Sequence, residues 1–184
     1  PQIYFAQEVR SHFLGHVVNH LQLDPRNIDI VAKARTARLA ASDAANAAYY
    51  QQRGADFDAR WTAAMARWNE KAAPLKGQPV VVMHRDQVYL CHWLGLKELA
   101  AIEPKPGVPP SAGHLSQLVS KLSGTPARMI LRNAYNDPKA ANWLSERVKA
   151  PVVLLPFSVG GTPEAKDLFG LFDDTLNQLL AVLQ

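Results

Sequence analysis

The residue best placed for chemistry is His84, which follows the apolar run 80–83 in the stretch VVVMHRDQVYL. That run has the β-branched composition of a strand. Ligand sites in open α/β sheets form at the carboxyl ends of parallel strands. A histidine there can offer an imidazole nitrogen to a divalent metal ion. The alternative is a structural histidine held by hydrogen bonds, and position alone leaves both open.

A second group of candidates consists of His12, His16 and His20, which are spaced four residues apart. In a helix this spacing places all three imidazoles on one face, a pattern that suits a transition metal. In an extended segment they could not converge. Solvated loop histidines are the alternative.

Two further features have structural explanations. Gly160-Gly161-Thr162 could form a turn that cradles phosphate with backbone amides, but the segment lacks a nucleotide-binding motif, which favours a plain strand-to-helix turn. The single cysteine, Cys91, lies in an apolar stretch, which favours a buried free thiol over a ligand or nucleophile. One cysteine also excludes an intrachain disulfide. Ser158 does not lie in a nucleophile-elbow context.

From residue 78 onward, β-rich runs alternate with helical segments. The expected strands are 80–83, 99–103, 127–131 and 152–155, and the expected helices are 86–94, 111–122, 138–149 and 164–183. Strict alternation predicts an α/β fold in which a four-stranded parallel sheet is flanked by helices.

Three helix starts are marked by a capping residue followed by proline. They are Asp24-Pro25, Asp137-Pro138 and Thr162-Pro163. The side-chain oxygen accepts a hydrogen bond from a free amide of the first turn, and proline has no amide hydrogen to lose there.

The segment 25–74 is rich in alanine, poor in strand formers and free of glycine except for Gly54. We expect a helix over 25–41 and a second over 42–73, with a possible weakness at Gly54. Together they predict a long helical spine between residues 1–24 and an α/β domain over 75–184.

The composition indicates a globular chain. Its 184 residues are 48% hydrophobic and carry a formal charge of +4, but basic residues are interleaved with acids, which argues against nucleic acid as a partner. The apolar runs are too short to span a membrane. The first residues lack the features of a signal peptide, so any export signal is expected to lie outside this sequence.

Four runs in the sequence carry a family resemblance. They are HLQLDPRN (20–27), APLKGQPVVVMH (73–84), HWLGLKELAAIEPKPGVPPSAGHL (92–115) and LPFSVGGTPEAKDLFGLFDDTL (155–176). The chain resembles the metal-specific periplasmic solute-binding proteins of bacterial ABC importers, in their zinc-type branch. The resemblance implies two lobes joined by a long helix, with 1–24 as a remnant of the amino-terminal lobe, 25–74 as the linking helix and 75–184 as the carboxy-terminal lobe.

The resemblance also implies a metal site between the lobes. His20 matches the family ligand that precedes the linking helix, and His84 matches the ligand of the second lobe. Val17-Val18-Asn19 replaces the usual Gly-Asn-Pro before the former. A first ligand would lie upstream of Pro1, and Glu164 is a weak match to a late carboxylate, so the site is expected to be incomplete here.

The implied function is capture of Zn²⁺ as transported ligand in the periplasm and its delivery to an ABC transporter permease, without catalysis. Histidine rather than glutamate at position 84 favours zinc over Mn²⁺, because imidazole is the softer ligand. Two alternatives are a truncated relative that acts as an interaction or scaffold module, and a small enzyme in which His84 is a general base beside Asp86.

Overall fold

The computed structural model describes residues 20–105 and 107–184. The chain divides into two compact units, Pro1–Glu70 and Lys71–Gln184, and each is described by itself below. His12 and His16 lie outside the described residues.

The first unit is helical. A short 3-10 helix, η1 (Leu21–Leu23), precedes α2 (Pro25–Ser42), and η2 (Ala44–Asn46) leads into α3 (Ala47–Ala72). Asp24 caps α2 as expected, because its carboxylate accepts a hydrogen bond of 2.9 Å from the Arg26 amide. The Arg26 guanidinium also contacts the buried Asp24 carboxylate at 2.6 Å.

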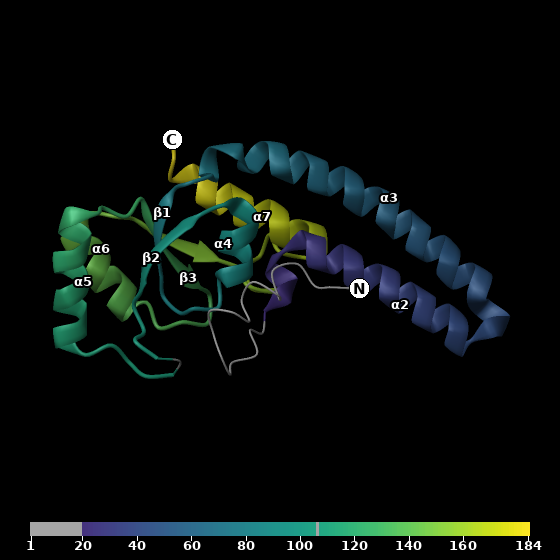
Figure 1. Cartoon of the computed structure of the whole chain (residues 1–184), viewed down its shortest axis with the longest axis horizontal. Helices are drawn as coiled ribbons and strands as arrows, with labels where there is room; N and C mark the ends of the chain where they lie inside the picture. The colour runs from purple at the N-terminus through teal and green to yellow at the C-terminus, as the bar shows by residue number, and fades with distance from the viewer. Residues whose placement is uncertain (1–19, 106) are drawn as a thin grey trace. The chain divides into compact units, whose positions relative to one another are not determined.

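The helices α2 and α3 fold back on each other as a hairpin (Figure 1). The Trp61 indole nitrogen donates a hydrogen bond of 2.9 Å to the Pro25 carbonyl. Lys33 of α2 pairs with Asp58 of α3 at 3.0 Å. The expected weakness at Gly54 is wrong, because α3 runs through this residue without a break. The helical segment therefore consists of two helices side by side.

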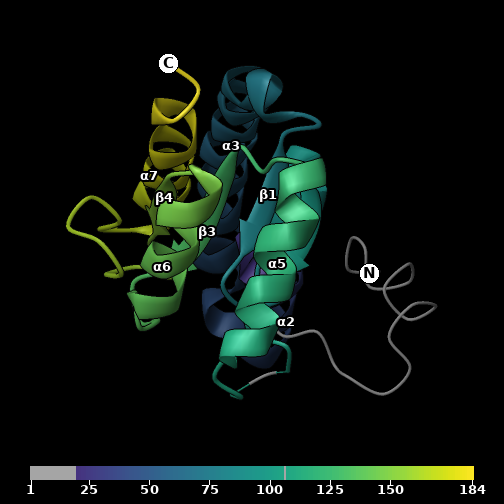
Figure 2. The same cartoon turned by 90° about the vertical axis from the view of Figure 1, so that its left-hand side faces the viewer.

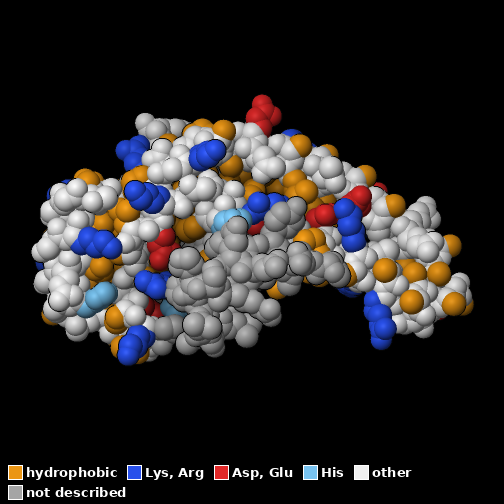
Figure 3. Space-filling model, viewed as in Figure 1, with side chains coloured by type: hydrophobic (Ala, Val, Ile, Leu, Met, Phe, Trp, Pro, Cys, Tyr) orange, Lys and Arg blue, Asp and Glu red, His pale blue; other side chains and the backbone are white. Residues whose placement is uncertain are grey.

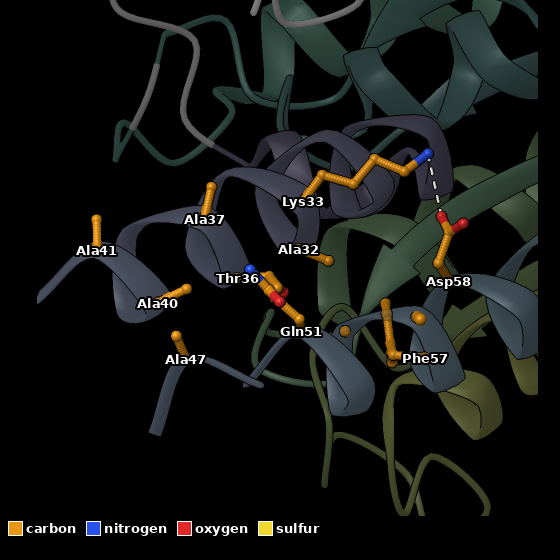
Figure 4. Close-up of a pocket in the computed structure, with 12 residues that line it drawn as sticks. Ala32, Lys33, Thr36, Ala37, Ala40, Ala41, Ala47, Gln51, Phe57 and Asp58 are labelled. Carbon is orange, nitrogen blue, oxygen red and sulfur yellow. Dashed lines mark ion pairs between the residues drawn. The ribbon is translucent and has the colours of Figure 1, made fainter. Parts of the chain in front are cut away.

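A groove of about 650 Å³ runs between these helices (Figure 4). Its walls carry small side chains from both helices, among them Ala37 and Ala40 of α2 and Ala47 and Ala55 of α3. Short side chains leave space between two helix backbones, so the groove follows from the alanine-rich composition.

The second unit is an α/β domain, as predicted. Its elements are η3 (Ala73–Leu75), β1 (Pro79–Val82), α4 (Val88–Leu94), β2 (Lys97–Ala101), α5 (Ala112–Gly124), β3 (Met129–Asn133), α6 (Lys139–Val148), β4 (Val152–Leu155) and α7 (Leu168–Ala181). The strands form one sheet in the order β2-β1-β3-β4, and every pair is parallel. β4 has the expected bounds, and β2 and β3 each lie two residues from theirs.

Helices cover both faces of the sheet (Figure 2). On one face, Val81 and Ile130 pack in a core with Leu118 of α5 and Leu144 of α6. The opposite face is covered by α7 (Figure 2), and α4 contacts α7 through the rings of Trp93 and Phe172, 5.5 Å apart. All three valines of β1 are fully buried because the sheet is covered on both sides.

Two predicted helix starts in this unit have different outcomes. Asp137 accepts a hydrogen bond of 2.9 Å from the Lys139 amide, and α6 begins within a residue of the expected position. The start at Thr162-Pro163 is wrong, since α7 begins at Leu168. Asp167 caps that helix through the Gly170 amide, at 2.7 Å.

Thr162 contacts the side of α7 and does not cap a helix. Its hydroxyl donates a hydrogen bond of 2.6 Å to Asp174 on the second turn of α7, so it serves a tertiary contact instead of a cap. The helix expected from residue 86 likewise begins later, at Val88.

The surface of the described part mixes charge types. On the face seen in Figure 3, lysine and arginine side chains lie among acidic and apolar ones. Among the described residues, the helices lack the combination of length and apolar content that a membrane crossing requires.

We predict that Gly54→Ala destabilises the helical hairpin. The added Cβ would lie 2.6 Å from the Thr36 side chain. Overpacking of this kind costs about 2 kcal/mol, and the better helix propensity of alanine offsets roughly 1 kcal/mol. Urea denaturation followed by circular dichroism should therefore show a net loss of about 1 kcal/mol.

The matched control is Gly124→Ala at the end of α5, where an added Cβ meets nothing within 4 Å. Thr36→Ala combined with Gly54→Ala should recover part of the loss. Equal stability of Gly54→Ala and the unaltered chain would contradict the close approach.

Candidate metal centre

The candidate centre lies at the end of β1, where the order in which strands are added to the sheet reverses. The chain passes from β1 to β2 on one side and later returns to place β3 on the other side of β1. The connections after β1 and β3 therefore diverge, and such a switch point is where open α/β sheets bind ligands. His84 comes two residues after the end of β1, and Asn133 is the last residue of β3.

His84 is held by a carboxylate from the neighbouring strand connection. Its Nδ1 lies 2.8 Å from Oε2 of Glu103, two residues beyond the end of β2. The side chains are 24% and 18% exposed, so the pair is partly shielded from water. The Glu103 amide donates a hydrogen bond of 3.0 Å to the Met83 carbonyl, which fixes the backbones of the two connections side by side.

A buried polar network stands beside this pair. The side-chain amide of Asn133 donates a hydrogen bond of 2.6 Å to Asp86, and its oxygen accepts one from Gln87. All three residues are at most 2% exposed. The Tyr135 hydroxyl also donates to Asp86. These bonds connect the segment after β1 with the end of β3, so they fix the loop that carries His84.

The network affects the titration of Tyr135. Burial and, after it, the hydrogen bond to the Asp86 carboxylate together raise the pKa of its phenol from the ordinary value to about 12. The hydroxyl therefore stays protonated and continues to donate to Asp86 throughout the neutral range.

Glu103 also lines a cavity of about 400 Å³. It is lined by Met83, Leu115 and Trp143, together with the charged side chains of Asp137 and Lys139. Glu103 thus lines this cavity and also contacts His84.

The carboxylate hydrogen-bonded to His84 is Glu103 and not Asp86. Asp86 is buried and accepts hydrogen bonds from Asn133 and Tyr135. A general-base arrangement of His84 with Asp86 is therefore not what the structure presents.

His20 belongs to the first unit and His84 to the second. The backbone of His20 is left-handed, with φ 80°, and its carbonyl accepts a hydrogen bond of 3.1 Å from the Leu23 amide. Within residues 20–105 and 107–184, no group of three or more His, Cys, Asp or Glu side chains is arranged to hold a metal ion.

Two of the remaining sequence candidates, Gly161 and Cys91, have structural roles. A Cβ at Gly161 would lie 1.7 Å from the Pro156 carbonyl oxygen, so this turn requires glycine for close packing. The turn does not open directly into a helix, which removes the basis for a phosphate cradle. Glu164 is exposed in the connection between β4 and α7. Cys91 is a buried free thiol, as predicted, and burial raises its pKa.

Sequence reasoning missed Glu103 and Asn133. Glu103 lies inside the run EPKPGVPPS that carries the family resemblance, but nothing in that run indicates which side chain it contacts. Asn133 lies beyond the predicted strand 127–131, which ends two residues before β3 does.

Solved structures of periplasmic metal-binding proteins share this fold. A crystal structure of ZnuA superposes with a TM-score of 0.70 at 22% identity, covering 86% of this chain and 59% of that one. The solute-binding protein FpvC of Pseudomonas aeruginosa, in complex with Ni²⁺, gives a TM-score of 0.72 at 17% identity, covering 90% of this chain and 62% of its own. FpvC has also been solved with Mn²⁺.

Residues 8–182 match the family described as ZnuA, zinc-uptake complex component A, periplasmic. The chain belongs to this family of metal-binding components of zinc uptake systems, which are transport proteins and not enzymes. The high-affinity zinc uptake system protein ZnuA of Brucella abortus is 25% identical over 131 residues, 71% of this chain and 39% of that protein. The same values hold for the proteins of Brucella suis and Brucella melitensis. The chain thus spans less than half the length of these relatives.

We predict that Asn133→Ala lowers the free energy of unfolding by about 3 kcal/mol, because buried groups of Asp86 and Gln87 lose a partner at a cost of roughly 1–3 kcal/mol each. Thermal and urea denaturation would measure the change. The control is Asn142→Ala on the exposed surface of α6, which should stay within about 0.5 kcal/mol of the unaltered chain. Equal effects of the two substitutions would show that the network contributes little.

We further predict that Cys91 does not react with a thiol-specific disulfide reagent in the folded chain, because the thiolate is the reactive form and burial disfavours it. It should react fully in guanidinium chloride. Val31→Cys in a Cys91→Ala background places a thiol at a site that is 44% exposed and should react without denaturant. Rapid labelling of Cys91 under native conditions would contradict its burial.

Proposed function

We propose that this chain is the part of a periplasmic zinc-capture protein that contributes His84 to the metal site and passes the ion to the membrane permease of an ABC importer. The observation that carries the proposal is the position of His84 at the switch point of the sheet, with one ring nitrogen already bonded to Glu103. Membership in the zinc-uptake family supports the transport role.

His20 is the second proposed ligand. It lies four residues before Asp24-Pro25, where α2 begins, and its left-handed backbone turns the chain just before that helix. The remaining ligands are expected in residues that the described segments do not include. Neutral imidazoles suit Zn²⁺ in tetrahedral geometry, and the ion releases protons from any histidine that was charged before binding.

Zinc is the proposed cargo in preference to manganese. The imidazole nitrogen is intermediate between hard and soft ligands and suits zinc, whereas Mn²⁺ favours the harder carboxylate oxygens. Structural relatives bind other ions, as the nickel and manganese complexes of FpvC show for that protein, so the fold does not set the metal.

The test is calorimetric zinc titration of the intact protein. His84→Ala should weaken zinc binding by more than the roughly 10- to 100-fold that loss of an outer partner costs. For His20 the informative change is His20→Asn, because asparagine tolerates a positive φ and removes only the imidazole. We expect it to weaken binding by at least about tenfold.

His92→Ala on α4 is the matched control and should leave zinc affinity unchanged. If His84→Ala also binds zinc as the unaltered protein does, the capture proposal is wrong, and an interaction or scaffold role becomes the better hypothesis.

A further inference from the structure

The Glu103 carboxylate contacts both a histidine ring and a backbone amide through one oxygen atom. Its Oε2 lies 2.8 Å from Nδ1 of His84, and the same oxygen lies 3.4 Å from the Gly107 amide. From this geometry we infer that Glu103 is a positioning residue, which keeps the proton of His84 on Nδ1 and leaves Nε2 free to bind a divalent cation. The inference rests on the proposed function of His84.

The backbone holds Glu103 in place. The Ile102 amide donates 2.9 Å to the Val82 carbonyl, and the Glu103 amide donates 3.0 Å to the Met83 carbonyl. The pairing of β2 with β1 thus continues past the ends of both strands. Glu103 is therefore fixed next to the residue that precedes His84, independently of its side-chain bond.

The Gly107 amide, which is the second contact of the carboxylate, lies beside a backbone bridge. The Val108 amide donates 3.0 Å to the Lys105 carbonyl, and the two residues form a β-bridge. Gly107 has φ 74°, which glycine adopts without strain. A Cβ there would meet nothing within 4 Å, so the backbone angle and not a lack of space explains the glycine.

The donors at this carboxylate determine the histidine tautomer. A backbone amide can only donate, and Oε2 therefore accepts from Gly107. The same oxygen accepts from His84 only if Nδ1 carries a hydrogen. A neutral imidazole with hydrogen on Nδ1 has its lone pair on Nε2, the atom that a metal ion would use. Carboxylate partners of this kind fix ring orientation and raise ligand basicity in metal sites.

The partial burial of His84 and Glu103 protects the hydrogen bond between them from competition by water. At 24% and 18% exposure, neither side chain is open enough for water to replace the bond freely. A bond to a charged acceptor is also about twice as strong as one between neutral groups. The tautomer should therefore be set before any metal arrives.

The experiment reads the tautomer directly, in metal-free protein. Long-range ¹H–¹⁵N spectra of the imidazole rings distinguish hydrogen on Nδ1 from hydrogen on Nε2, and the His84 signal is assigned by its loss in His84→Ala. At a pH above the histidine titration range, the unaltered protein should show His84 with hydrogen on Nδ1. Hydrogen on Nε2 would overturn the inference without any variant.

Glu103→Ala should move the His84 proton to Nε2 and weaken zinc binding by about 10- to 100-fold. Glu146→Ala, which removes the same charge from the exposed face of α6, should change neither. The signals of His92 and His114 report whether the variant is folded. An unchanged His84 tautomer in a folded Glu103→Ala protein would contradict the positioning role.

If Glu103→Ala does not fold, Glu103→Gln serves instead. The Gly107 amide requires an acceptor, so the glutamine oxygen should take the place of Oε2 and keep the hydrogen of His84 on Nδ1. Hydrogen on Nε2 in the folded variant would count against the inference. Because these spectra need no metal, their outcome is separate from that of the zinc titration of His84→Ala, which tests the proposed function itself.

Discussion

The parallel pairing of β1 with strands on both of its sides is the constraint on which the candidate centre depends. Val82 lies opposite Ala101 in one neighbour and Leu131 in the other. The ladder continues past these residues, since the Met83 amide donates 2.8 Å to the Leu131 carbonyl. This continuation aligns three chain segments at the same level beyond the sheet. A shift of register in either pair would move Glu103 away from His84 or Asn133 away from Asp86, because side chains alternate faces along a strand.

Much of this domain could be predicted from local signals. The valines of β1 indicate a strand buried on both faces, and Asp24-Pro25 and Asp137-Pro138 mark helix starts that the structure confirms. These signals act over a few residues. The rule fails at Thr162-Pro163 because a long-range bond to Asp174 and the close packing of Gly161 set the local conformation. The contact of His84 with Glu103 joins residues 19 apart and depends on strand register, which the sequence alone does not determine.

In the helical segment, too, composition predicts the helices but not the tertiary contacts between them. Alanine-rich sequence indicates helix, and both helices were predicted. The turn between them depends on Asp43, whose carboxylate accepts hydrogen bonds from Asn46 at 2.9 Å and Tyr50 at 3.0 Å. These bonds, that from Asn46 first, hold the pKa of Asp43 below its ordinary value. A hairpin then forms because Gly54 admits the Thr36 side chain, a contact that only the folded pair of helices shows.

The strand order has a further consequence for the solubility of the domain. β2 and β4 are the two edges of the described sheet, and an open edge can pair with another molecule and start aggregation. β2 begins with Lys97 and Glu98, whose charges resist such pairing. β4 is apolar but lies between Pro151 and Pro156, which have no amide hydrogen with which to extend a ladder. Each edge thus carries its own protection against intermolecular β-pairing, one by charge and the other by missing donors.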